Sequence, residues 1–265
     1  MGTRDYRPAS EYPELTRWLS MAAERRRIVY IRPVATTAET MVQRALQGLA
    51  YPIRGGALGT VIGLAILSVI PVLSLLAVPL ASFYVVAAVR ESARGEKALP
   101  AWVDSSDLME VLKVWLKTVL VSLVALFPVI GWIAFWYLGG GDRSGPEALV
   151  SLFVGLAVAG LVSFGYYPAC LATVAVWDSV VDSLNPAYIY RVIRTIGSDY
   201  AIFLTATILS WAAGMGLRLL FGSLLDGVPF IGAIPGHMAS LWASLYAAHL
   251  LGWAVHRNQH DLGWE

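Results

Sequence analysis

Long apolar stretches alternate with short polar ones along most of the chain. After a polar first part, the apolar runs cover residues 56–89, 118–138, 148–177, 200–225 and 231–255. The hydrocarbon core of a bilayer is about 30 Å thick, and an α-helix needs about 20 residues to cross it. Most of these runs are long enough for one crossing, so the pattern predicts a bundle of transmembrane helices.

The first apolar run, residues 56–89, is too long for one straight crossing. As a single helix its 34 residues would extend about 51 Å. Pro71 and Pro79 are expected to interrupt it, either as one kinked helix or as two short ones. Lys and Arg collect on cytoplasmic flanks, and nine of them precede the run while five follow it in residues 90–117. Both flanks are therefore expected inside, with two crossings and a turn near Pro71.

The charges of the other loops extend this topology. Residues 139–147 hold Arg143 as their only cation, and the loop near Asp226 holds none, so both are expected outside. We therefore predict an all-α bundle of about six membrane helices, arranged as three hairpins, with both termini in the cytoplasm. Its predicted parts are a basic cytoplasmic tail (1–37), a transmembrane helical domain (38–256) and a cytoplasmic C-terminal tail (257–265).

Two short segments beside the cytoplasmic loops are amphipathic. Lys113 and Lys117 follow Asp107 and Glu110 at three- and four-residue spacing, and Arg191 and Arg194 recur in the same way within residues 185–195. The first segment is expected to lie in the headgroup layer before the helix turns into the bilayer. The four cations are either plain topology anchors or contacts for lipid headgroups or a partner.

Composition supports a membrane protein and narrows its chemistry. Hydrophobic residues make up 57% of the chain and charged residues 14%, whereas soluble domains carry roughly 25% charge. The net charge of +1 does not favour nucleic acid as a partner. The single cysteine, Cys170, excludes an intrachain disulfide and a cysteine-rich metal site.

Reactive residue patterns are missing from the sequence. It contains no GxSxG, no HExxH and no P-loop, so we predict a protein that is not an enzyme and has no cofactor or metal site. His249 is an ionisable group within the last apolar run, and such a group is either a neutral hydrogen-bonding residue or a functional one. Arg218 lies near the outer end of the run 200–225, where it is expected to pair with Asp226 or to clamp a substrate.

Small residues recur every fourth position in two of the expected helices. At this spacing they let helix backbones approach closely in lipid. They serve either packing within the bundle or a face for a dimer or partner subunit. The residues are Gly55, Gly59 and Gly63 in the first helix, and Gly236, Ser240, Ser244, Ala248 and Gly252 in the last.

Several short motifs also resemble a known family. They are Tyr51-Pro52, Leu99-Pro100-Ala101-Trp102, Tyr188 with Arg191 and Arg194, and Val228-Pro229-Phe230-Ile231-Gly232. In these the chain resembles, over residues 45–256, a family of prokaryotic multi-helix membrane proteins of unknown function, distantly similar to the membrane domain of some glycerophosphodiester phosphodiesterases. The resemblance implies a helical bundle in a prokaryotic cytoplasmic (inner) membrane, and it implies no activity or catalytic residue.

Abundant packing signals without a reactive group favour a non-enzymatic membrane scaffold or accessory subunit of a membrane complex. Its expected partners are membrane lipids and either another protein or a second copy of the chain. The alternative is a transporter or lipid-handling protein, because helices interrupted by Pro and Gly are common in transporters.

Overall fold

The computed structural model describes residues 40–96, 98–99, 107–139, 145–225, 228 and 231–263. The predicted tail, residues 1–37, lies outside these ranges. Within them all regular structure is helical and no strand occurs. The elements are α2 (Met41–Gly48), the 3-10 helix η2 (Tyr51–Gly56), α3 (Ala57–Val69), α4 (Pro71–Ala93), α5 (Leu108–Ala125), α6 (Phe127–Leu138), α7 (Pro146–Trp177), α8 (Val180–Leu184), α9 (Pro186–Ile196), α10 (Ser198–Leu224), the 3-10 helix η4 (Ile231–Ala233) and α11 (Ile234–Arg257).

Four of the described helices, α4, α7, α10 and α11, are long and apolar enough to cross a membrane. The number rises to six if two bent pairs of helices each count as one span. The prediction of an all-α chain with several helices long and apolar enough to span a membrane is confirmed for the described residues.

The first apolar run breaks where the sequence indicated. α3 ends at Val69, and Ile70 adopts an extended conformation before Pro71 starts α4. Proline is favourable there because its missing N–H falls in the first helical turn, where that group has no partner. The expected break at Pro79 is wrong, since α4 continues through this residue. A proline inside a membrane helix is tolerated when neighbouring groups satisfy the freed carbonyl.

The apolar run 118–138 is expected to begin with a turn into the bilayer near Lys117, but the bend comes later, after Ala125. α5 is continuous through Lys113 and Lys117 to Ala125, and the chain bends by 47° between α5 and α6. Pro128 stands in the first turn of α6, where its missing N–H needs no partner within the helix. The amphipathic segment and the apolar stretch that follows it therefore form one straight helix.

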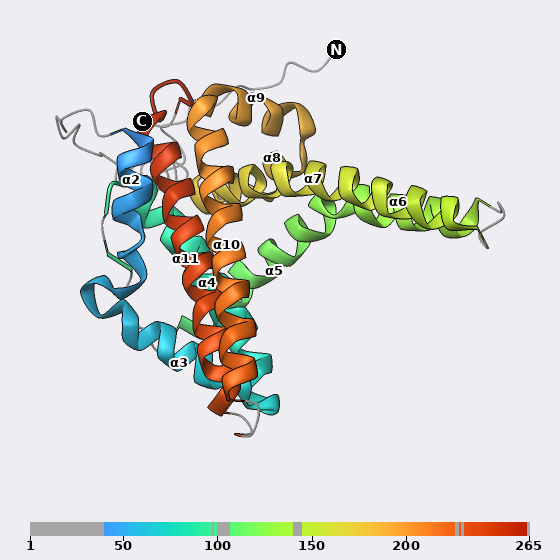
Figure 1. Cartoon of the computed structure of the whole chain (residues 1–265). Coiled ribbons are helices and arrows are strands. Elements are labelled where there is room, and N and C mark those ends of the chain that lie inside the picture. The colour runs from blue at the N-terminus through green and yellow to red at the C-terminus, as the bar shows by residue number, and fades with distance from the viewer. Residues whose placement is uncertain are drawn as a thin grey trace, which may run out of the picture.

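α11 is the central helix of the bundle. It packs against α10, α4 and α3, and these helices lie side by side in Figure 1. Twelve of its residues are buried. At Gly252 a Cβ atom would lie 2.3 Å from the carbonyl oxygen of Val89, so only glycine permits the observed distance between α11 and α4.

A second part of the molecule projects away from this bundle (Figure 1). α6 and the first half of α7 pack against each other and run across the direction of α10 and α11. No residue of α6 is buried, and the first buried residue of α7 is Ala159. We call α6 together with residues 146–158 the arm.

Candidate functional site

The fully buried histidine belongs to a cluster of polar and aromatic side chains between α11, α4 and the N-terminal helices. His249 and Ser92 are both 0% exposed, and the Oγ of Ser92 lies 2.7 Å from Nδ1 of His249. The ring of Tyr51 stacks on the imidazole, with 4.0 Å between ring centroids and 12° between ring planes. We call Arg44, Tyr51, Ser92, His249 and Trp253 the buried polar cluster.

Arg44 is the charged member of the cluster. It lies on α2, which Thr40 and Gln43 start with a capping box in which each side chain bonds the other's backbone N–H. The Arg44 side chain is 1% exposed, and its guanidinium carbon lies 4.2 Å from the centre of the Trp253 ring. A desolvated cation over an indole face is stabilised by about 2 kcal/mol. The cluster thus offsets part of the cost of burying this charge.

Two further aromatic residues of α11 bind the same N-terminal segment through its backbone. The Tyr246 hydroxyl donates to the carbonyl of Ala45 at 2.9 Å, and the Trp242 indole donates to the carbonyl of Leu49 at 3.0 Å. The last carbonyls of a helix have no partner within the helix. Donors on α11 therefore satisfy the end of α2 and hold it against the bundle.

The Ser92–His249 pair has the spacing of a nucleophile and its base, but its surroundings favour a structural role. Both residues are fully buried, and a Cβ atom at Gly48 would lie 3.2 Å from the imidazole. A substrate could reach the hydroxyl only after α2 had moved away. The cluster holds α2 and α4 to α11.

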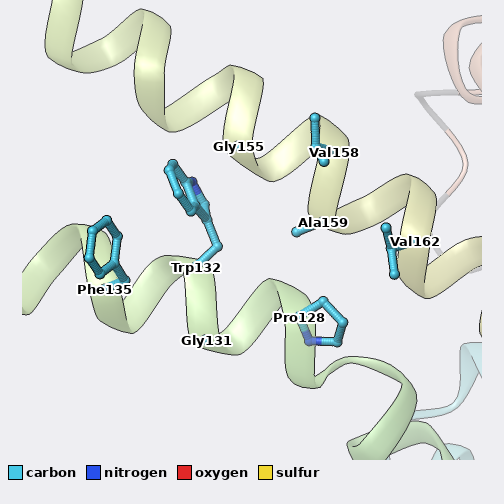
Figure 2. A pocket seen from close by; sticks show the side chains of 8 residues that line it. All are labelled: Pro128, Gly131, Trp132, Phe135, Gly155, Val158, Ala159 and Val162. Carbon is cyan, nitrogen blue, oxygen red and sulfur yellow. The ribbon is translucent and has the colours of Figure 1, made fainter. Parts of the chain in front are cut away.

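A groove lies between α6 and α7, lined mainly by residues of the arm (Figure 2). Its volume is about 680 Å³, and every side chain that lines it is apolar. The ring of Trp132 occupies the space beside Gly155, where a Cβ atom would lie 1.8 Å from the indole. The lining residues are Pro128, Gly131, Trp132, Phe135, Gly155, Val158, Ala159 and Val162.

Two tryptophans hold the arm together. The indole N–H of Trp132 donates to the carbonyl of Leu152 at 3.2 Å, and that of Trp136, one turn later, donates to the carbonyl of Ala148 at 3.3 Å. In a medium without water such hydrogen bonds lack competition from solvent. The arm is therefore a preformed helical hairpin although it has few contacts with the bundle.

The four predicted surface cations have different surroundings in the structure. Lys117 forms an ion pair with Asp178 at 2.7 Å. Lys113 is exposed on α5 and has no ion pair among the described residues. Arg191 and Arg194 lie on the exposed side of α9, whose opposite side buries Ile189, Val192 and Ile196.

Arg218 lies exposed on α10, and its predicted partner Asp226 lies outside the described residues. Its stem packs over Gly236 of α11, where a Cβ atom would lie 2.9 Å from Cγ of Arg218. Arg218 and His237 also line a pocket of about 270 Å³ at this end of the α10–α11 hairpin.

The small residues of α11 differ in surroundings. Gly236 and Gly252 meet α10 and α4, and Ala248 is buried, whereas Ser240 and Ser244 donate to carbonyls of their own helix.

The small residues predicted at every fourth position of the first helix do not all lie in one helix. Gly55 belongs to η2 rather than α3, because α3 begins only at Ala57 after Pro52 and a 3-10 turn. Gly59 has no atom within 4 Å of a built Cβ, and Gly63 is half-buried. The prediction that Gly55 lies in the same helix as Gly59 and Gly63 is therefore wrong.

Sequence reasoning missed four members of the buried polar cluster, Arg44, Tyr51, Ser92 and Trp253. Tyr51 stood only in a family motif, and Arg44 was counted as a cytoplasmic cation. The capping box at Thr40 and Gln43 is the signal that could have placed Arg44 on a helix. Nothing in the sequence around Ser92 indicates its contact with a histidine 157 residues away.

Comparison of the chain with protein family models, with curated proteins and with solved structures finds no match. The family resemblance of residues 45–256 therefore stays a prediction.

Proposed function

We propose that the chain is a non-enzymatic scaffold or accessory subunit of a membrane complex, and that its arm binds a membrane-spanning helix of another subunit. The observation that carries this proposal is the arm itself, an apolar helical hairpin in which α6 buries no residue.

The composition of the arm restricts where it can lie. A helix at the membrane surface needs a strongly polar face, but α6 has no charged residue, and residues 146–158 contain only Glu147. The arm therefore lies in hydrocarbon or against apolar protein.

Apolar surface alone does not drive helix association in lipid, whereas close packing does. The groove provides a place for such packing, because a Cβ atom at Gly131 would meet no atom within 4 Å. No lining side chain is charged, so the occupant that fits is an apolar helix.

The same proposal includes the topology expected from the charges. The chain lies in a prokaryotic cytoplasmic membrane with both termini in the cytoplasm. Six crossings as three hairpins would require the arm, which runs across α10 and α11, to turn parallel to them. The turn between α3 and α4 at Ile70 supports two crossings in the first run.

The experiment is affinity purification of the intact protein in nanodiscs, followed by mass spectrometry of the retained proteins and lipids. Gly131→Leu fills the groove, and Gly216→Leu on α10 is the matched control because its Cβ also meets open space. We expect a stoichiometric subunit with the unchanged protein and with Gly216→Leu, and its loss with Gly131→Leu. A monomer without a partner in all three preparations would overturn the proposal, and a second copy in place of another subunit would make the chain its own partner.

A lipid-handling protein is the second candidate. The groove volume of about 680 Å³ lies within the range of small-molecule sites, about 300–1,000 Å³, which are mostly apolar. This function predicts that the unchanged protein retains one lipid species without any protein partner, and that Gly131→Leu releases it.

A further inference from the structure

The pocket at the end of the α10–α11 hairpin combines two polar side chains with an apolar border. It is lined by Arg218, Gly222, Leu225, Val228, Gly232, Ala233, Gly236 and His237. These residues belong to the C-terminal end of α10, to the turn that follows it, to η4 and to the start of α11, and Figure 1 shows this end of the hairpin remote from α9.

Gly236 sets the position of Arg218. A Cβ atom at this residue would lie 2.9 Å from Cγ and 3.6 Å from Cδ of the arginine. Any larger residue would displace the stem, so the glycine lets Arg218 lie across α11 beside His237. Arg218 has no ion pair within the described ranges.

The length of α10 places this pocket at the headgroup level. Its 27 residues extend about 40 Å, whereas the hydrocarbon core is about 30 Å thick. Arg218 lies six residues before the end of the helix at Leu224. A long cationic side chain near a helix end directs its charge to the interface while its stem stays in apolar surroundings.

We propose that this pocket binds the phosphate group of a phospholipid. The planar guanidinium donates two parallel hydrogen bonds to phosphate oxygens, and a ring N–H of His237 adds a third donor. Val228, which lines the pocket, is 42% exposed and offers the acyl chains an apolar surface. Inorganic phosphate shares the headgroup chemistry but leaves this surface without a ligand.

The test measures lipid retained by the full chain in nanodiscs of phosphatidylcholine with a minor fraction of phosphatidylglycerol. Native mass spectrometry after release from the nanodisc counts the bound lipids. Arg218→Gln removes the charge, and Arg218→Lys keeps the charge but not the planar fork. Arg257→Gln is the matched control, because it removes an exposed arginine from the opposite end of the α10–α11 hairpin.

We expect one tightly bound phospholipid on the unchanged protein and on Arg257→Gln. Arg218→Gln removes charge-assisted hydrogen bonds, which are stronger than neutral ones, and is expected to weaken retention at least about tenfold. Arg218→Lys and His237→Ala are expected to give smaller losses. Equal retention by Arg218→Gln and the unchanged protein would overturn the proposal.

A second measurement tests the proposal even if Arg218→Gln folds poorly. Added phosphatidylglycerol is expected to raise the thermal unfolding temperature of the unchanged protein but not of Arg218→Gln, each compared with itself without lipid. Excess inorganic phosphate distinguishes the two sources of the phosphate group. Stabilisation by inorganic phosphate alone, equal to that by the lipid, would overturn the assignment to a phospholipid.

Discussion

The bundle and the arm differ both in composition and in packing. α6 is entirely apolar and buries none of its twelve residues, whereas α11 contains serines, histidines and an arginine and buries twelve of twenty-four. Apolar character therefore does not decide which helix becomes central. Gly252 and the buried polar cluster give α11 close contacts with its neighbours, while the arm relies on two indole hydrogen bonds between its own helices.

The difference matters because lipid is as apolar as a leucine side chain. Helices in a bilayer gain little from burying leucine and much more from close contact and hydrogen bonds. The bundle has both, so it is expected to hold together without a partner. The arm is expected to exchange its contacts with lipid for contacts with a partner when that partner binds.

Filling the closest contact of the bundle should have the largest effect. Gly252→Leu would place side-chain atoms into the backbone of Val89 and the Cβ atom of Ser92, 2.3 Å and 2.7 Å from a built Cβ. Overpacking costs typically 1–3 kcal/mol and sometimes more, so we expect a loss of about 3 kcal/mol in the free energy of unfolding. Denaturation in mild detergent, followed by circular dichroism, measures this change.

Gly131→Leu in the arm is the control for that change, because its Cβ meets open space. Its effect on the free energy of unfolding should stay below about 0.5 kcal/mol. Equal destabilisation by both substitutions would contradict the distinction between bundle and arm.

Removing the buried imidazole should have the next largest effect. His249→Ala loses the contact with Ser92, the stacking on Tyr51 and the volume of a fully buried ring. Truncation of large buried side chains costs about 2–5 kcal/mol, and we expect about 2–4 kcal/mol here. Phe135→Ala in the arm, where the side chain is 67% exposed, should change the same free energy by less than about 0.5 kcal/mol. A larger effect at Phe135 would mean that the arm packs in solution as tightly as the bundle.

The sequence allowed the helices to be predicted, because apolar runs of more than twenty residues have few alternatives in a chain with so little charge. It also placed the break at Ile70, since Pro71 offers a local reason. The bend at Leu126 has a similar cause in Pro128, but several prolines elsewhere, such as Pro79 and Pro168, lie inside continuous helices. Proline alone therefore does not predict a bend.

The direction of the arm and the burial of Arg44 depend on contacts between distant parts of the chain. A count of cations treats Arg44 as a solvated charge, but the face of Trp253, 209 positions later, covers it. Likewise, nothing in the apolar sequence of α6 distinguishes it from α3 or α4. Only the small residues and hydrogen-bonding groups of neighbouring helices decide which apolar helix joins the bundle.

Loss of one indole hydrogen bond should have a local effect that differs between the two regions. Trp132→Phe keeps the ring beside Gly155 but removes the donor to the Leu152 carbonyl, a change of about 1 kcal/mol. Hydrogen exchange should become faster in residues 146–158 and stay unchanged in α2. Trp242→Phe removes the donor to the carbonyl of Leu49. It should make hydrogen exchange faster in α2 and leave it unchanged in residues 146–158. Faster exchange throughout the molecule for either variant would show that arm and bundle unfold together.

The smallest effect is expected where the arm's second helix ends in the bundle. Asp178 closes α7 with φ of 55° and pairs with Lys117 at 2.7 Å and with Arg90 at 3.9 Å. Its side chain is 66% exposed, so Asp178→Asn should lower the free energy of unfolding by less than about 1 kcal/mol. Asn tolerates the left-handed conformation, which keeps the backbone unchanged and isolates the charge.

Salt separates this ionic contribution from packing. The difference between Asp178→Asn and the unchanged protein should disappear at about 1 M salt, where the screening length is about 3 Å. The direction of α7 should not change, because the continuous buried stretch from Pro168 to Ala175 holds it against α4 and α5. Distances between spin labels at exposed sites of the arm and of α10 measure this direction. A shift in those distances caused by Asp178→Asn would show that the ion pairs, and not the packing of α7, set the direction of the arm.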